Sequence, residues 1–111
     1  MLREKQLPQY VQSIVGDYFL RNLELPEGAL LTVTKVDVSP DRLYAKAWVS
    51  ILPENLASEC LPIIKHHLYG AQKAINEKVQ TRPTPRLSIK LDINPSYSSR
   101  IDELLKEINE Q

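Results

Sequence analysis

The chain has 111 residues, a formal charge of zero from 14 basic and 14 acidic residues, and a hydrophobic content of 42%. This size allows a single core, so we expect one domain over residues 1–111 and no elaborate internal active site. No apolar run approaches the length of a membrane span and the first residues lack an apolar signal core, so we expect a cytoplasmic protein. Cys60 is the only cysteine, which excludes an internal disulfide and a thiolate metal cluster.

The first expected element is a helix that begins near Leu7 and Pro8, because proline is tolerated in the first turn of a helix. Its apolar residues recur at three- and four-residue spacing and are Leu7, Val11, Ile14, Val15 and Tyr18. This spacing predicts an amphipathic helix whose apolar side covers a core. Residues 25–28 contain proline and glycine and break the chain after it.

Residues 31–52 are typical of two strands joined by a tight turn at residues 39–41. In the second strand, two sets of residues alternate. One set is small or branched and apolar, namely Leu43, Ala45, Ala47, Val49 and Ile51, and the other is Tyr44, Lys46, Trp48 and Ser50. This period of two places the apolar groups on one face of a sheet, which needs a helical cover. In the first strand, apolar residues fall at both odd and even positions, so we expect it to have a neighbouring strand on each side.

A second helical segment is expected to begin between Ser58 and Pro62, with an apolar stripe of Leu61, Ile64, Leu68, Ala71 and Ile75. Gly70 falls on the side opposite this stripe. A glycine inside a helix costs roughly 1 kcal/mol relative to alanine. It therefore marks either a kink or a place where another group approaches the backbone closely. His66 and His67 point in different directions and have no carboxylate at ligand spacing, so we expect no metal site.

The prolines in residues 81–86 end this helix. A strand follows, in which Leu87, Ile89 and Leu91 alternate with polar residues. After a turn at residues 94–96, a last helix presents one apolar face of Tyr97, Ile101, Leu104 and Ile108. The expected order is therefore helix, strand, strand, helix, strand, helix.

The zero net charge hides an uneven distribution, because residues 61–90 contain six basic residues and a single acidic one, Glu77. The basic residues are Lys65, Lys73, Lys78, Arg82, Arg86 and Lys90. A polyanion is the natural partner of such a segment, although a run of charge is equally often only a solvated face.

Several of these side chains are placed where they can meet phosphate. Lys73 is expected beside Gly70 on the outer side of the helix, so that an ammonium group and an uncluttered backbone meet the same phosphate. Arg82 and Arg86 flank rigid prolines, which restricts the motion of their guanidinium groups. The residues that we predict to bind RNA are Lys46, Gly70, Lys73, Lys78, Arg82, Arg86 and Lys90.

Lys46 is expected on one sheet face together with Tyr44 and Trp48. The two aromatic side chains could form a platform on which bases stack. Alternatively, Trp48 is a half-buried aromatic residue under a helix end. The sequence leaves both interpretations open.

Four segments occur in a characteristic order: LTVT at 31–34, VDVSPD at 36–41, AKAWVS at 45–50, and the pattern R-x-x-P-x-L-x-x-x-x-D. The last pattern is formed by Arg82, Pro85, Leu87 and Asp92. No segment is specific alone, but in this order and spacing they make nearly the whole chain resemble the ribosome-binding factor A family. Ordinary KH domains have a Gly-x-x-Gly loop, which this sequence lacks. The family has a kinked Ala-x-Gly junction instead, and residues 68–70 match its glycine but not its alanine.

The resemblance implies an α+β fold, namely a KH-like type II domain in the order helix-strand-strand-helix-kink-helix-strand-helix. Its three-stranded mixed sheet would be covered by helices on one face. The resemblance further implies a non-enzymatic assembly factor that binds the small (30S) ribosomal subunit and assists late maturation and processing of its 16S rRNA. We expect such a protein to be a monomer.

Two other classes of function remain to be compared with this one. A protein-interaction module of similar fold would dock acidic protein surfaces and would not bind RNA. An enzyme is disfavoured, because no nucleophile arrangement, glycine-rich phosphate loop or paired-carboxylate motif is evident. We therefore expect no catalytic residues, no cofactor, no metal, no membrane partner and no small-molecule substrate.

Overall fold

The computed structural model describes residues 6–80, 82–92 and 99–110. In these residues the elements follow the expected order, with one short 3-10 turn added before the second helix. They are α1 (Leu7–Asn22), β1 (Leu30–Val38), β2 (Tyr44–Leu52), η1 (Glu54–Leu56), α2 (Ala57–Lys78), β3 (Arg86–Leu91) and α3 (Ser99–Asn109). Tyr97, which was expected on the apolar face of the last helix, lies outside the described residues.

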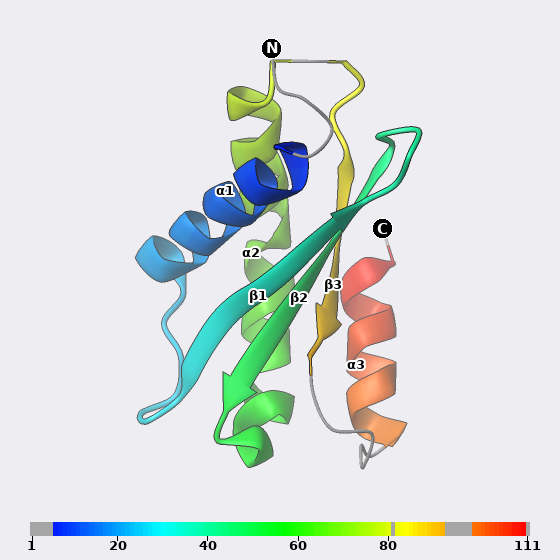
Figure 1. Cartoon of the computed structure of the whole chain (residues 1–111). Helices are drawn as coiled ribbons and strands as arrows, with labels where there is room; N and C mark the ends of the chain where they lie inside the picture. The colour runs from blue at the N-terminus through cyan, green and yellow to red at the C-terminus, as the bar shows by residue number, and fades with distance from the viewer. Residues whose placement is uncertain (1–5, 81, 93–98, 111) are drawn as a thin grey trace.

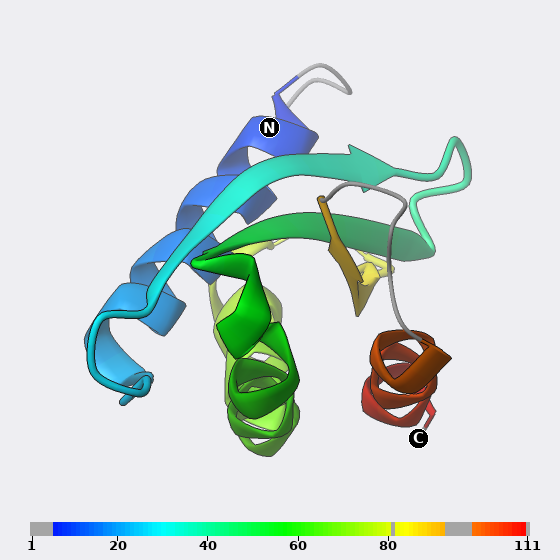
Figure 2. The same cartoon turned by 90° about the horizontal axis from the view of Figure 1, so that it is seen from below.

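The three strands form one mixed sheet in the order β1-β2-β3. β1 pairs with β2 in the antiparallel sense, and β2 pairs with β3 in the parallel sense. All three helices lie on the same side of this sheet, and no described helix covers its other face (Figures 1 and 2). The α+β class and the helical cover on one face are therefore confirmed.

β1 is an edge strand, so the expectation of a neighbour on each side was wrong. The reason is a β-bulge: Val33 pairs with Val49 and Lys35 pairs with Trp48, which leaves Thr34 as the extra residue. An extra residue shifts the alternation of side chains by one position. Val33 and Val36 are therefore both buried although they stand three residues apart.

The core lies between the helices and the covered face of the sheet. The expected apolar residues of β2 and of the α2 stripe are buried, and so are those of α1 except Tyr18, which is partly buried. Leu43, which was expected on the apolar face of the second strand, precedes β2 and is 42% exposed. Phe19 is the α1 residue that the periodicity missed, and it is 3% exposed. From α3, the core receives Ile101, Leu104 and Ile108.

α2 runs as one helix from Ala57 to Lys78, and the expected division into two helices at Gly70 is not found. Gly70 instead makes room for a side chain from α1. A Cβ atom at this position would overlap the hydroxyl of Tyr18 and would lie 2.5 Å from its Cζ atom. The Tyr18 hydroxyl is also 3.4 Å from Nδ1 of His67, one turn earlier in α2. The close approach that the glycine permits is therefore a contact between two helices of the same chain.

Two amide side chains close the outer edge of β3. Gln72 of α2 accepts a hydrogen bond from the Leu87 N–H (2.7 Å) and donates one to the Pro85 carbonyl (3.0 Å). Asn109 of α3 accepts from the Ile89 N–H (2.8 Å) and donates to its carbonyl (3.0 Å). Each amide stands where a peptide group of a further strand would stand, so these edge groups are satisfied without strand addition.

We predict that Asn109→Ala lowers the free energy of unfolding by about 1–3 kcal/mol, because it leaves both main-chain groups of Ile89 without these partners. Glu110→Ala, at an exposed neighbouring residue, is the matched control and should change the stability little. Urea denaturation followed by circular dichroism measures both. Equal stability of the two variants would contradict a role for Asn109 in closing this edge.

Candidate nucleic-acid interface

The uncovered face of the sheet carries basic and aromatic side chains in rows that cross the strands. In the strand register, Trp48 of β2 is flanked by Lys35 of β1 and Lys90 of β3. Lys46 is flanked by Asp37 and Ser88 in the next row. Side chains at paired positions of neighbouring strands project from the same face and lie close to one another. The rows therefore bring together residues from all three strands.

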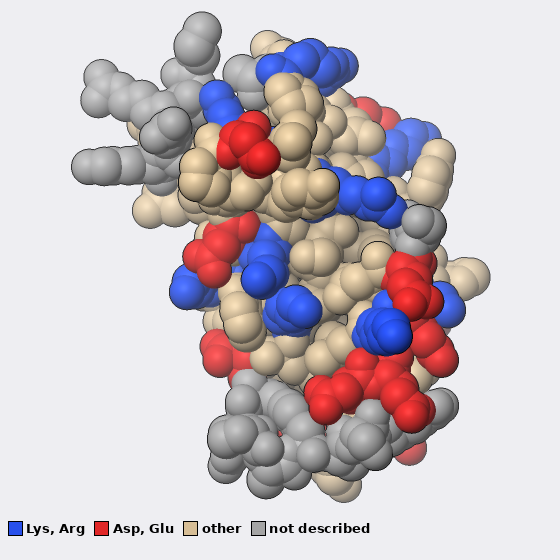
Figure 3. All heavy atoms as spheres, turned by 90° about the vertical axis from the view of Figure 1, so that its right-hand side faces the viewer, with Lys and Arg blue, Asp and Glu red and all other residues tan. Residues whose placement is uncertain are grey.

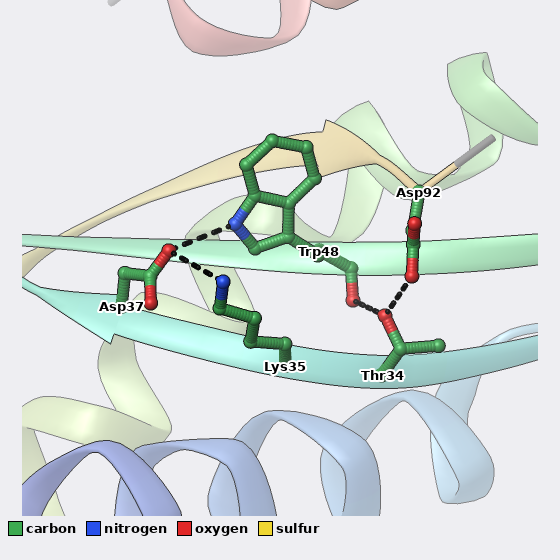
Figure 4. Close-up of polar contacts among 5 residues, drawn as sticks. All are labelled: Thr34, Lys35, Asp37, Trp48 and Asp92. Atoms are coloured by element: carbon green, nitrogen blue, oxygen red, sulfur yellow. Dashed lines mark hydrogen bonds and ion pairs between the residues drawn. The ribbon is translucent and has the colours of Figure 1, made fainter. Parts of the chain in front are cut away.

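Trp48 lies on this face and under none of the described helices, while stacking on bases stays a prediction. Its side chain is partly buried, and its indole N–H donates to Oδ2 of Asp37 at 3.2 Å. The same oxygen is 3.5 Å from the Lys35 ammonium nitrogen, and Figure 4 shows both groups turned toward it. Asp37 thus holds the polar edge of the indole in place while the ring stays on the uncovered face.

Tyr44 extends the aromatic surface along β2. It alternates with Lys46 and Trp48 on the same face, and it is 59% exposed. Its partner across the parallel pair is Arg86, the first residue of β3. A cationic surface with exposed aromatic rings is the combination that single-stranded nucleic acids favour, because phosphates are attracted to the charges and bases stack on the rings.

The bulge residue Thr34 fixes one end of this surface. Its hydroxyl lies 2.9 Å from Oδ2 of Asp92 and 3.2 Å from the carbonyl oxygen of Trp48 (Figure 4). The main-chain N–H of Asp92 donates to the Val49 carbonyl at 2.7 Å. Asp92 therefore connects the end of β3 to β1 across the central strand, which gives the last residue of the R-x-x-P-x-L-x-x-x-x-D pattern a structural role.

The residues predicted to bind RNA do not share one surface. Lys46 and Lys90 lie on the uncovered face, with Arg86 at its border. Lys73 and Lys78 are exposed on α2, and Lys73 lies on the side of the helix opposite the buried stripe, hence away from the sheet. Arg82 is exposed in the turn between α2 and β3. Gly70 lies beneath Tyr18 of α1.

Lys35 is the basic residue of this face that sequence reasoning missed. It stands outside the basic segment 61–90, and simple alternation places it on the same face as the buried Val33. The bulge at Thr34 moves it to the uncovered face. No pattern in the sequence marks that bulge.

Charges of the two signs are unevenly distributed over the surface. In Figure 3 several Lys or Arg side chains lie at the left, toward the uncovered face, with Asp or Glu beside them, and a cluster made mostly of Asp and Glu lies at the lower right. Among the residues of α3 whose side chains are described, the exposed charged ones are Asp102, Glu103, Lys106 and Glu107, and the exposed Glu110 follows the helix. Negative charge on α3 and positive charge on the sheet give the molecule a directional field, which orients an approaching polyanion.

Among the described residues, two side chains have a shifted pKa, and both shifts have structural explanations. The carboxylate of Asp41 accepts hydrogen bonds from the Ser39 hydroxyl (2.6 Å) and the Leu43 N–H (3.0 Å), and these bonds lower its pKa. The same two bonds stabilise the β1–β2 turn. Burial raises the pKa of the Cys60 thiol, so this cysteine is not an activated nucleophile.

Within the described part of the chain, no three His, Cys, Asp or Glu side chains are grouped as metal ligands. None of the described helices combines the length and the apolar character needed to cross a membrane.

Comparison with known proteins places this fold in a defined group. Residues 3–105 match the family described as Ribosome-binding factor A. The solution structure of a putative ribosome binding factor A from Thermotoga maritima superposes with a TM-score of 0.67 at 21% identity, covering 85% of this chain and 91% of that one. The crystal structure of ribosome-binding factor A from Thermus thermophilus superposes with a TM-score of 0.64 at 20% identity, covering 80% of this chain and 94% of that one. The family match spans nearly the whole sequence and the two structures share its fold, so the chain belongs to the ribosome-binding factor A family.

Proposed function

We propose that this protein is a non-enzymatic assembly factor of the cytoplasm that binds the small (30S) ribosomal subunit as a monomer and assists late maturation and processing of 16S rRNA. Membership of a ribosome-binding family supports the ribosome as partner. The observation that carries the choice of RNA over ribosomal protein is the uncovered sheet face, where Lys35, Lys46 and Lys90 surround Trp48.

The sheet face provides two kinds of contact with rRNA. The ammonium groups of Lys46 and Lys90 bind phosphate oxygens, and these contacts provide most of the affinity. Tyr44 and Trp48 stack on unpaired bases, with the indole already oriented by Asp37. Because the strands are rigid and the rows are set by the sheet register, little ordering is needed when RNA binds.

The remaining predicted residues form a second basic surface in this proposal. Lys73 and Lys78 contact phosphate from α2, and Arg82 contacts it from the turn that joins α2 to β3, while Arg86, the first residue of β3, stands at the border of the sheet face. Gly70 contributes through the packing of Tyr18 rather than by contact with the RNA backbone. The subunit thus meets the domain at a main sheet surface and at a weaker helical one.

A protein-interaction module remains the competing function, because the same basic sheet face could dock an acidic protein surface. The two functions differ in their dependence on RNA. A module of this kind would bind subunit proteins after the rRNA has been removed, whereas an RNA-binding factor would bind protein-free 16S rRNA.

We predict that affinity for isolated small subunits falls steeply as salt concentration rises. Each neutralised phosphate should contribute a slope of roughly −0.7 to −0.9 in a plot of log K against log salt. Co-sedimentation across a range of potassium chloride concentrations measures this slope, with large subunits as the control. A flat response, or equal binding to both subunits, would contradict the proposed function.

A further inference from the structure

A groove of about 930 Å³ lies between α1 and the edge strand β1, next to the sheet edge that β3 does not occupy. Its lining includes Gly16 and Leu20 from α1, the turn at Pro26, and Leu30 and Leu31 from β1. The RNA-binding face proposed above does not include this groove.

The groove presents large apolar groups to solvent. Leu20 is 84% exposed and Leu30 is 61% exposed, although both are side chains that usually pack against other groups. Gly16, one turn before Leu20 in α1, leaves open space in the groove, because a Cβ atom built there meets nothing within 4 Å. An exposed apolar groove of this size on a small domain indicates a binding surface.

The edge of β1 offers main-chain groups to the same groove. Gln12 of α1 donates from Nε2 to the Val33 carbonyl at 3.1 Å, so this carbonyl points away from β2. In an antiparallel strand, both main-chain groups of a residue point to one side and the pattern repeats at every second residue. The main-chain groups of Leu31 therefore face the groove. The outer edge of β3, by contrast, is closed by Gln72 and Asn109.

The charge of the groove selects between possible occupants. Its lining includes two carboxylates, Asp17 and Glu27, and no Lys or Arg. Asp17 is paired with Arg21 at 3.2 Å, whereas the described residues place no cation in an ion pair with Glu27. Such a groove repels phosphate and favours a positively charged ligand.

We propose that this groove binds an extended basic segment of another protein, which adds to β1 as a further strand. The main chain of the segment pairs with Leu31. Its side chains alternate between the two faces of the sheet: those on the helical side pack on Leu20 and fill the space above Gly16, those on the other side pack beside Leu30, and a Lys or Arg side chain lies beside Glu27. Strand addition combines main-chain hydrogen bonds for affinity with alternate side-chain pockets for specificity.

The probes are synthetic eight-residue peptides with blocked ends in which lysine alternates with valine, isoleucine or tyrosine. They are added to the full chain labelled with ¹⁵N, and the backbone amide signals are followed by NMR. We expect saturable shifts at residues 16–20 and 30–33, and none at residues 44–48. Replacing two central residues of the best peptide by proline, which removes main-chain donors, should abolish the shifts.

Three variants test the contacts. Leu30→Ser should weaken binding of the best peptide about tenfold, because it removes most of an apolar contact. Glu27→Lys should weaken it about fivefold or less, as is typical of one exposed charge pair. Glu107→Lys, on α3 and outside the groove, is the matched control and should bind like the wild type.

The proposal would be overturned by any of four results. These are an absence of saturable shifts with every peptide, shifts confined to the sheet face, equal binding of a peptide with glutamate in place of lysine, and tighter binding of a uridine octanucleotide at residues 16–33. Concentration-dependent shifts at these residues without peptide would identify a second copy of the chain as the occupant and would also overturn it.

Discussion

Alanine at Gly70 should destabilise the protein, whereas alanine at Gly16 should stabilise it. Both glycines lie inside helices, where alanine is intrinsically preferred by up to about 1 kcal/mol. At Gly16 a methyl group enters open space, so the free energy of unfolding should rise by about 0.5–1 kcal/mol. At Gly70 it collides with the ring of Tyr18, and such overpacking typically costs about 1–3 kcal/mol.

A double-mutant cycle isolates the cause of the difference. In a Tyr18→Ala background the collision at Gly70 is absent, so Gly70→Ala should become neutral or stabilising there. Thermal and urea denaturation of the four variants measures the coupling. If Gly70→Ala has the same effect with and without Tyr18, the contact between α1 and α2 does not explain the glycine.

Reversing the charge of the sheet face should cause the largest loss of subunit binding. Lys46→Glu and Lys90→Glu should each weaken the affinity about tenfold, because each removes a charge-assisted interaction and adds repulsion. The same changes at Lys73 and Lys78 of α2 should have smaller effects. The salt slope should decrease by roughly one for each phosphate that the variant no longer neutralises.

The control for this series is Lys106→Glu, which reverses an exposed lysine on the acidic helix α3. It changes the net charge as much as the other variants do, so it separates a local contact from a general effect of charge. Lys46 is exposed and should tolerate glutamate without loss of stability. If the α2 variants lose more affinity than the sheet variants, the main RNA-binding surface lies on the helical layer.

The sequence predicted β2 and the apolar stripes of the helices well, because their patterns are strictly local. Alternation at residues 44–51 and three- or four-residue spacing in α1 and α2 depend only on the geometry of one element. The bulge at Thr34 is different, since it is defined by pairing with another strand. It explains both errors in β1, namely the expected second neighbour and the overlooked position of Lys35.

The basic segment 61–90 shows why contiguous charge in a sequence does not predict a contiguous surface. The chain leaves α2 in the helical layer, turns at Arg82 and enters the sheet at β3. Its positive residues are thereby divided between two layers. On the sheet, the neighbours of Lys90 include Lys35 and Lys46, which lie outside the segment 61–90 in the sequence.

Gly70 illustrates what could and could not be foreseen. Its place opposite the apolar stripe indicated either a kink or a close approach of some group to the backbone. The identity of that group depends on how α1 crosses α2, and no feature of α2 alone encodes this. The structure places the Tyr18 side chain there.

The most direct test of the proposed RNA-binding surface is ultraviolet cross-linking of the wild-type protein to isolated small subunits, followed by mass spectrometry of the peptides that carry nucleotides. Trp48 is the only tryptophan and lies in the centre of the sheet face, so a cross-link to it has one structural meaning. We expect nucleotides on peptides that contain residues 44–48 and 86–90, with fewer on residues 73–78. Nucleotides found only on α2, or on no peptide of a complex that co-sediments, would contradict RNA binding through the uncovered face of the sheet.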